Sequence, residues 1–292
     1  MAHDTFQVGD LTAVIGDNQA HDKHAAGYNG IHQLTHRSEP TTLFVPTVAG
    51  LNLEHIFDGD QELRGRKDPK LFFKPRTAPM AFKKLSDSEA ELHQPPTPTF
   101  KLESWTRFKL VAPHYLDLTF RCRPTQHALR HGYIGLFWAS YVNAPEDKSL
   151  YFRGEGRWQH CSPQHYSQST VVHRANKVSL DFSAVPGDAL CKSLSPLRFD
   201  EPFYYGLFRR HLFLLMFDHS EGVRFTHSPS GGGLNPELQT TNPAWDFLFI
   251  IPAYEVLREY GFRARAVYRE RCSRQEALRE FGDWRKSLAP CK

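Results

Sequence analysis

The sequence has few sulfur-containing residues and no apolar run long enough to cross a membrane. Its 292 residues include 3 Met and 5 Cys, at positions 122, 161, 191, 272 and 291. An odd number of cysteines without a Cys-x-x-Cys pair argues against a disulfide framework or a thiolate zinc site. The longest apolar run covers residues 212–217, whereas a membrane-spanning helix needs about 20 residues. The first residues lack the basic and apolar regions of a secretory signal. We therefore expect a cytoplasmic protein.

The charges are balanced and scattered along the chain. There are 36 Lys and Arg against 32 Asp and Glu, which gives a formal net charge of +4. No lysine-rich arm or basic block is present, so the pattern argues against binding to a nucleic-acid backbone. Aromatic residues make up 13% of the chain. They suit strands and surfaces that stack on flat ligands, and we expect a small polar ligand such as a carbohydrate.

Strand patterns recur along the chain. Residues 115–123 alternate between apolar and polar side chains, which is typical of a strand with one buried face. At the C-terminus, Ser273 and Glu276 form a capping-box pattern before an apolar stripe, which predicts a helix at about 273–288. Further strands are expected at residues 11–15, 30–35, 100–111, 133–142, 150–153, 169–173, 178–182, 203–208, 212–217, 222–226, 245–251 and 262–268. This order predicts one all-β domain spanning residues 1–292, a large antiparallel sandwich with one C-terminal helix.

The order and texture of these segments resemble the galactose mutarotase-like group of β-supersandwiches, which contains the aldose epimerases. The resemblance lies in residues 29–34 (Asn-Gly-Ile-His-Gln-Leu), 44–55, 115–120 and 242–247. It implies a supersandwich fold and a carbohydrate ligand. The Asn-His-x-x-Phe-Asn-like segment of aldose epimerases is absent, so the resemblance assigns no catalytic residue.

The 16 histidines are the outstanding feature of the composition, because imidazole titrates near neutral pH and binds metals. His21 and His24 are spaced as in a metal-binding or acid/base loop, but such spacings arise readily in a His-rich chain, and an exposed polar loop is the preferred interpretation. In the segment from Asn52 to His55, a regular strand would point Glu54 and His55 to opposite faces. Of these two, His55 is the better catalytic candidate, although a core or edge role is favoured for the segment.

Three further segments combine rings with charged groups. Glu103, Trp105 and Arg107 would share one face of a strand, as a sugar-binding row or as an ion pair over a tryptophan. The segment from Trp138 to Asp147, together with Tyr151, Arg153, Trp158, His160 and His165, would form a ligand cleft or belong to an aromatic core. His227 precedes three consecutive glycines at 231–233, which indicate a lid or a plain loop, and Asp246 would face the same cleft.

These patterns lead to one preferred hypothesis and two alternatives. The preferred one is an epimerase, mutarotase or lyase that acts on a sugar or sugar acid by acid/base chemistry. The alternatives are a non-catalytic sugar-binding module and a metal-dependent cupin-like barrel enzyme. The sequence indicates no definite cofactor, a divalent metal ion is compatible with the histidines, and the oligomeric state is not indicated. The catalytic candidates are His55, Glu103, His160 and His227, and the substrate-binding candidates are Asn29, Trp105, Arg107, Trp138, Tyr141, Arg153, Trp158 and Asp246.

Overall fold

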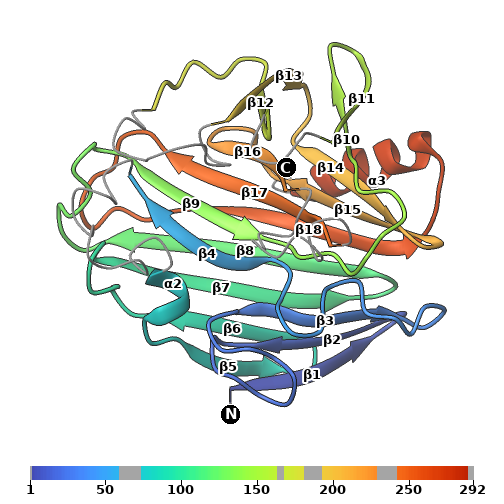
Figure 1. Cartoon of the computed structure of the whole chain (residues 1–292), viewed down its shortest axis with the longest axis horizontal. Helices are drawn as coiled ribbons and strands as arrows, with labels where there is room; N and C mark the ends of the chain where they lie inside the picture. The colour runs from blue at the N-terminus through green and yellow to red at the C-terminus, as the bar shows by residue number, and fades with distance from the viewer. Residues whose placement is uncertain (1, 59–73, 163–167, 181–192, 229–241, 289–292) are drawn as a thin grey trace.

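The protein is described here from a computed structural model, which covers residues 2–58, 74–162, 168–180, 193–228 and 242–288. In this part of the chain the strands form three sheets of nine, six and three strands. Figure 1 shows the three- and six-stranded sheets in front of the nine-stranded one. An isolated bridge between Ile31 and Gly50 connects the two smaller sheets, which together make up the second layer of a β-sandwich.

The nine-stranded sheet is antiparallel throughout and is ordered β11-β10-β14-β15-β18-β8-β7-β6-β5. In chain order its strands are β5 (Ala81–Ser86), β6 (Glu89–Gln94), β7 (Leu102–Val111), β8 (Tyr115–Pro124), β10 (Leu150–Gly154), β11 (Arg157–Cys161), β14 (Phe203–Phe208), β15 (His211–Phe217) and β18 (Tyr260–Glu270). The expected alternation along β8 is confirmed, because its apolar residues are buried while Asp117 and Arg121 are not.

The second layer consists of two sheets, with the strand orders β1-β2-β3 and β13-β12-β16-β17-β9-β4. Only the β12–β13 pair among these described strands is parallel. The strands are β1 (His3–Val8), β2 (Leu11–Gly16), β3 (Gly30–His36), β4 (Asn52–Phe57), β9 (Ile134–Ala139), β12 (Thr170–His173), β13 (Leu194–Phe199), β16 (Val223–Ser228) and β17 (Ala244–Ile251).

Aromatic side chains from both layers meet in the core. Phe120 and Phe262 of the nine-stranded sheet contact Trp138 of β9, and Trp138 stacks on Phe247 of β17 at a centroid distance of 4.9 Å. Side chains alternate along a strand, so residues next to these core positions point outward. The two outer faces of the sandwich are therefore the surfaces where polar side chains gather.

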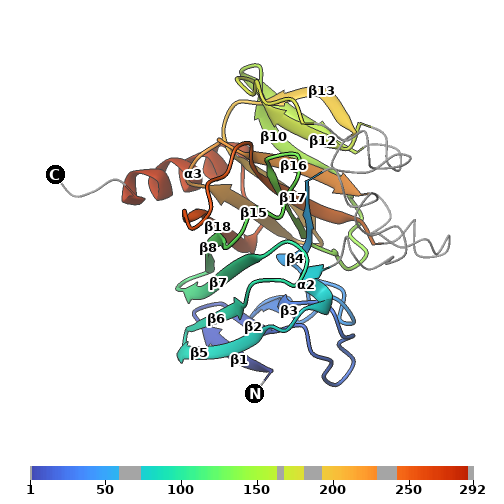
Figure 2. The ribbon, with the colours of Figure 1, turned by 90° about the vertical axis from the view of Figure 1, so that its left-hand side faces the viewer.

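Two helices are described. α3 (Arg274–Leu288) begins at the predicted capping box, since Ser273 N donates to Glu276 Oε2 at 2.9 Å and Glu276 N donates to Ser273 Oγ at 3.2 Å. Its Ala277 and Trp284 pack with Phe203 and Tyr205 on the outer face of the nine-stranded sheet, where Figure 2 shows it on the far side from β16 and β17. α2 (Lys74–Thr77) is a single turn against β4.

The prediction of a strand at residues 178–182 is wrong for residues 178–180, which belong to no strand or helix. Residues 181 and 182 lie outside the described residues. Six observed strands, β1, β4, β5, β6, β11 and β13, were not among those expected. β5 is mostly exposed, so it lacks the apolar run that marks a buried strand. Neither described helix has the length and apolar character to span a membrane, and Cys122, Cys161 and Cys272 are free thiols.

His227 lies inside the sandwich. Its Nε2–H donates to the carbonyl of Lys148 at 2.6 Å, and Trp245 Nε1 donates to the same oxygen at 3.0 Å. His227 is therefore a buried residue of β16, while residues 229–241, which contain the three glycines of the expected lid or loop, lie outside the described part. Burial lowers the pKa of His227 to about 4, so this ring is neutral in the folded protein at neutral pH.

This burial predicts a loss of stability in mild acid. An unfolded histidine titrates near pH 6.5, so between pH 6.5 and about 4 the unfolded chain binds a proton at His227 that the folded chain excludes. Stability therefore falls as the pH drops through this window, by about 2 kcal/mol between pH 7 and pH 5. Urea unfolding at both pH values measures this difference, and in His227→Gln the difference should be smaller by the contribution of His227. The exposed-site variant His127→Gln should keep the wild-type difference, and an equal difference in His227→Gln would contradict the assignment.

Candidate functional site

The outer face of the six-stranded sheet carries an unusual set of buried polar side chains. Leu53 of β4, Phe225 of β16 and Phe247 of β17 point into the core. The residues that alternate with such core residues along each strand face outward. Charged side chains are rarely fully buried unless they are paired or functional. This face is therefore the leading candidate for a functional site. Among the described residues, the buried polar ones on it include Glu54, Thr170, Arg224, Thr226 and Asp246, with the Tyr141 hydroxyl beside them.

A β-bulge places Glu54. In the pairing of β4 with β9, Leu53 lies opposite Trp138 and His55 lies opposite Phe137, so Glu54 is an extra residue in the ladder. A bulge rotates the local backbone and re-aims side chains. The expectation that Glu54 and His55 point to opposite faces is thus wrong: His55 Nε2 lies 3.4 Å from Glu54 Oε1.

Both carboxylate oxygens of Glu54 have partners. The Tyr141 hydroxyl donates to Oε2 at 2.6 Å, and Asn52 Nδ2 donates to the same oxygen at 3.2 Å. On the other side, Arg76 Nη1 lies 3.6 Å from Oε1. We refer to these residues, with Tyr28, as the Glu54 cluster: Tyr28, Asn52, Glu54, His55, Arg76 and Tyr141.

α2 and the segment before β3 form the rim of this cluster. The guanidinium of Arg76 stacks on the ring of Tyr28 at 4.0 Å, and its Nε donates to the carbonyl of Gly27 at 3.1 Å. Asn18 holds α2 in place by donating from Nδ2 to the carbonyls of Pro75, Arg76 and Ala78. The side chain of Arg76 is 20% exposed and that of Glu54 is 6% exposed, so the carboxylate lies at the base of the cluster and the arginine nearer the solvent.

Burial shifts the ionisation of both carboxyl groups on this face. It raises the pKa of Glu54, against the opposing effects of the Tyr141 hydrogen bond and the Arg76 charge. It raises the pKa of Asp246 well above the ordinary value, and the charge of Glu54 adds to this rise, while the hydrogen bond from Ser140 N opposes it. Two interacting carboxyls that retain protons more readily than usual, beside a phenol, are suited to acid/base chemistry.

Four of the residues predicted from sequence lie on or next to this face. Tyr141 and His55 belong to the Glu54 cluster, and Asp246 accepts a hydrogen bond from Ser140 N at 2.9 Å. Asn29 has a different position from the one expected of a ligand-binding residue. It is buried, its Nδ2 donates to the carbonyl of Leu53 at 2.9 Å, and its Oδ1 accepts from Leu53 N at 3.1 Å, so it fastens β4 to the segment before β3.

Glu103, Trp105 and Arg107 do share one face, as predicted, but it is the outer face of the nine-stranded sheet. Glu103 accepts from Arg123 at 2.7 Å and contacts His93 at 3.0 Å. His93 stacks on Trp105. This geometry matches the ion-pair alternative, and both layers of the sandwich separate it from the Glu54 cluster.

The expected cleft of aromatic and basic residues is not assembled by the described part of the chain. Trp138 lies in the core. Trp158 contacts Tyr205 near α3, and His160 lies by Tyr151 on the same side. The prediction that Trp158 and His160 share one face is therefore confirmed, but this face belongs to a different cluster from that of Tyr141. Arg153 lies 5.8 Å from the Trp158 ring. His165 lies outside the described residues. The four catalytic candidates His55, Glu103, His160 and His227 thus occupy four separate environments.

Sequence reasoning missed Arg76, Tyr28 and Asn52, and it ranked Glu54 below His55. The only signal for Tyr28 is its place between Gly27 and Gly30, where both glycines adopt positive φ angles of 93° and 94°. Arg76 lies on a single helical turn without an amphipathic pattern. Its proximity to Glu54 depends on the Asn18 contacts, which connect residues nearly 60 positions apart.

A histidine cluster adjoins the Glu54 cluster at the three-stranded sheet. It consists of His3, His21, His24 and His32, and the ring of His24 contacts the ring of Tyr28 edge-on at 6.4 Å. The expectation of an exposed polar loop is wrong for His24, which is 4% exposed. Burial, with smaller effects from His24 and His21, lowers the pKa of His32 to about 2. Within the described residues, His21, His24 and His32 are the set suited to holding a metal ion.

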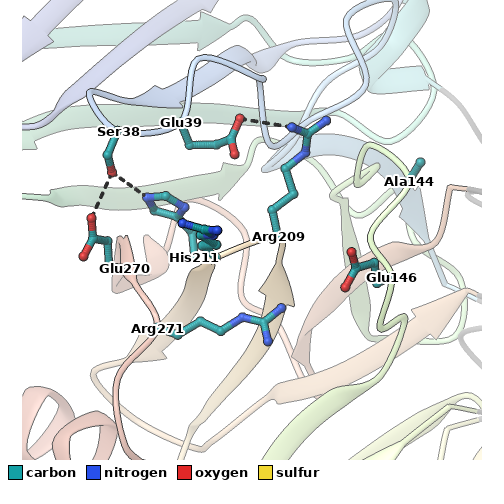
Figure 3. A pocket seen from close by; sticks show the side chains of 9 residues that line it. Ser38, Glu39, Ala144, Glu146, Arg209, His211, Glu270 and Arg271 are labelled. Carbon is teal, nitrogen blue, oxygen red and sulfur yellow. Dashed lines mark hydrogen bonds and ion pairs between the residues drawn. The ribbon is translucent and has the colours of Figure 1, made fainter.

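A cleft of about 990 Å³ lies beside β14, β15 and the end of β18. Figure 3 shows Ser38 between His211 and Glu270, with Arg209 directed at Glu39. Ser38 Oγ lies 3.1 Å from His211 Nε2 and donates to Glu270 Oε1 at 3.2 Å. The cleft has the size of a ligand pocket, and Arg210 and Arg271 add positive charge. It lacks a buried carboxylate comparable to Glu54.

The Asn29 clamp gives a stability prediction. Asn29→Ala leaves the N–H and C=O of Leu53 without side-chain partners in a buried position, and each such loss costs about 1–3 kcal/mol. We expect the free energy of unfolding, measured by urea denaturation, to fall by roughly 2–4 kcal/mol. Asn143→Ala removes one longer hydrogen bond, from Nδ2 to the carbonyl of Thr42 at 3.3 Å, and serves as the matched control. A loss in Asn29→Ala no larger than in this control would show that the clamp is unimportant.

Comparison with known proteins supports the fold assignment. No family model and no curated protein matches the chain. Among solved structures, a putative aldose 1-epimerase from Escherichia coli K12 aligns with a TM-score of 0.55 and 10% sequence identity, over 92% of this chain and 99% of that one.

Two longer enzymes align less well. They are a heparan sulfate lyase from Pedobacter heparinus (TM-score 0.47, 9% identity, 93% of this chain and 36% of that one) and a 4-alpha-glucanotransferase from Thermococcus litoralis (0.49, 10%, 91% and 37%). TM-scores below 0.5 add nothing to the assignment. The predicted architecture is confirmed by the first alignment: the chain has the galactose mutarotase-like β-sandwich fold.

Proposed function

We propose that the protein is a carbohydrate-active enzyme that transfers protons at a sugar or sugar acid on the outer face of the six-stranded sheet. The observation that carries this proposal is Glu54, a buried carboxylate within reach of a phenol, an imidazole and a guanidinium. The class of substrate is supported by the fold, which is similar to that of a protein named a putative aldose 1-epimerase. A shared fold alone does not fix an activity, so the residues of the site decide the chemistry.

In this proposal Glu54 is the base and Asp246 the acid. For mutarotation, Glu54 would take the proton of the anomeric hydroxyl while Asp246 protonates the ring oxygen, so that the bond between that oxygen and the anomeric carbon breaks. The ring then closes on the other face, and both protons return. Two carboxyls with raised pKa values fit this division of roles, since one can hold a proton at a pH where the other has lost it.

Arg76 and Tyr28 have a binding role in this scheme. Arg76 lies on the rim, nearer the solvent than Glu54, so its guanidinium could bind a sugar hydroxyl or a uronate carboxylate. With a uronate, the same base could instead remove the proton on the carbon beside the carboxylate. Asp246 would protonate the oxygen that leaves the next carbon, so that a C=C bond forms as the C–H and C–O bonds break. Mutarotation and elimination are therefore both to be assayed, by NMR of the anomeric signals and by absorbance of an unsaturated product.

A non-catalytic sugar-binding role is the second candidate. One observation favours it: both oxygens of Glu54 already have protein partners, as expected of a structural carboxylate. A thermal-shift screen against neutral sugars, uronic acids and sugar phosphates identifies ligands, because a ligand of the folded state raises the melting temperature. Binding of a sugar without any conversion would favour this second candidate.

Removing the proposed base should abolish turnover while preserving the fold. General acid–base groups typically contribute about 10²–10⁴-fold, so we expect Glu54→Gln to lower kcat/KM by at least about 100-fold for the sugar that the screen identifies. Glu280→Gln is the matched control, because Glu280 on α3 also accepts hydrogen bonds from a tyrosine and an arginine, Tyr115 at 3.1 Å and Arg269 at 3.0 Å. Equal activities of the two variants would refute the role of Glu54.

The pH profile provides an independent test of the same base. If Glu54 must be ionised, kcat/KM falls on the acid side with a midpoint above the ordinary carboxyl value of 4.5. The Tyr141 hydrogen bond lowers the pKa of Glu54, so Tyr141→Phe should move that midpoint to higher pH. Tyr115→Phe, which loses the hydroxyl that donates to Glu280, should leave it in place. An acid limb that does not move in Tyr141→Phe would exclude Glu54 as the titrating group.

A further inference from the structure

We propose that His21, His24 and His32 form a binding site for one divalent late transition-metal ion, with Zn²⁺ as the first candidate. The site lies outside the Glu54 cluster and does not rest on the proposed function. Each of the three histidines offers one ring nitrogen, and these three atoms lie within 4.8 Å of one another.

The backbone brings the three rings together from two segments. Asp22 adopts a φ of 47°, and the tight turn around it lets His24 N donate to the His21 carbonyl at 2.7 Å. His32 comes from β3, at the register shift between β2 and β3 that separates the Ile15–Ile31 pair from the Val14–Gln33 pair. The bulge leaves His32 without a ladder partner and turns it toward the two loop histidines.

Close packing of the rings supports a metal site more than a set of ordinary buried histidines. His24 stacks on His32 with ring centroids 3.4 Å apart, and His3 stacks on His21 at 3.5 Å. His21 Nε2 lies 2.6 Å from His32 Nδ1. Four imidazoles in contact, two of them at most 4% exposed, concentrate ring nitrogens in a place with little access to water.

The hydrogen bonds leave nitrogen lone pairs in the cluster. His24 Nε2–H donates to the carbonyl of Tyr28 at 2.8 Å, an arrangement that fixes the ring and is usual for the outer nitrogen of a metal-bound histidine. By hydrogen-bond geometry, four buried ring nitrogens have no partner among the described residues: His3 Nδ1, His21 Nδ1, His24 Nδ1 and His32 Nε2. Asp22 Oδ2 lies 3.8 Å from His21 Nδ1, and the backbones of Val48 and Asp17 interact with the rings of His24 and His32. Buried polar atoms in proteins nearly always have partners, so a group of orphaned nitrogens at one place points to a ligand.

The donor set selects the kind of ion. Neutral imidazole nitrogens suit Zn²⁺, Cu²⁺ and Ni²⁺, whereas Ca²⁺ and Mg²⁺ require oxygen ligands. In a tetrahedral site with Zn–N distances of about 2.0–2.1 Å, two nitrogens lie about 3.3–3.4 Å apart. Shifts of about an ångström or less in the side chains would therefore bring the three ring nitrogens into coordination, with the fourth position left for His3, water or another ligand.

A metal ion here would fasten the segment between β2 and β3 onto the three-stranded sheet. This segment also carries Asn18, which holds α2, and Tyr28, on which Arg76 stacks. The predicted effect of the ion is therefore on the stability of this part of the chain, and it is measurable without any enzymatic assay.

The test uses the full chain, stripped with a chelator, desalted and then titrated with ZnCl₂. We expect about one zinc per chain by elemental analysis after gel filtration, a raised melting temperature, and nitrogen neighbours at about 2.0–2.1 Å by X-ray absorption at the zinc edge. MgCl₂ at the same concentration should produce no shift. Less than a tenth of an equivalent of zinc in the wild type would overturn the proposal.

Variants identify the site. His24→Gln and His32→Gln should each lower zinc retention at least tenfold, while the exposed-site control His127→Gln should retain the wild-type amount. Because His32 is buried and its variant is at risk of misfolding, His21→Gln, at a position that is partly exposed, is compared as well, with circular dichroism to verify the fold. Wild-type zinc retention by folded His21→Gln and His24→Gln would place the metal elsewhere and refute the assignment.

Discussion

The structure depends on the burial of one face of every central strand between the two layers. Phe120 and Phe262 from one layer and Trp138 and Phe247 from the other fill this space, and the removal of their rings from water is the main source of stability. Because side chains alternate along a strand, this burial leaves the positions in between for the outer faces. Asp246 on β17 and the row of Glu103, Trp105 and Arg107 on β7 both follow this alternation, on opposite outer faces of the sandwich.

The two outer faces use their charges in different ways. On the nine-stranded sheet, Glu103 lies in an ion pair with Arg123 across neighbouring strands, and its pKa is lowered despite partial burial. On the six-stranded sheet, burial dominates, and it raises the pKa values of Glu54 and Asp246. Desolvated carboxyls of this kind destabilise a fold unless they are well paired. Glu54 is paired with Tyr141, Asn52, His55 and Arg76, and Asp246 accepts a hydrogen bond from Ser140 N.

The Glu54 cluster and the histidine cluster are connected through Tyr28. Its ring contacts Tyr141 at 5.8 Å, carries the guanidinium of Arg76 and meets the edge of His24. The segment between β2 and β3 therefore supplies residues to both clusters. Its anchoring depends on Asn18 and Asn29, whose side-chain amides bond to backbone groups of α2 and β4. We expect a substitution of either asparagine to displace residues of both clusters.

The sequence by itself determined the fold class, most of the central strands, the capped C-terminal helix and the set of side chains on each face of β7 and β8. These features follow from local periodicity, which a buried strand or an amphipathic helix must have. The tertiary structure alone decided which polar residues meet. A bulge at Glu54 and another beside His32 break the period of two that parity arguments assume, and the contact between Arg76 and Glu54 joins an irregular turn to a strand. Such placements depend on backbone irregularities and on contacts between distant residues, neither of which leaves a periodic signal in the sequence.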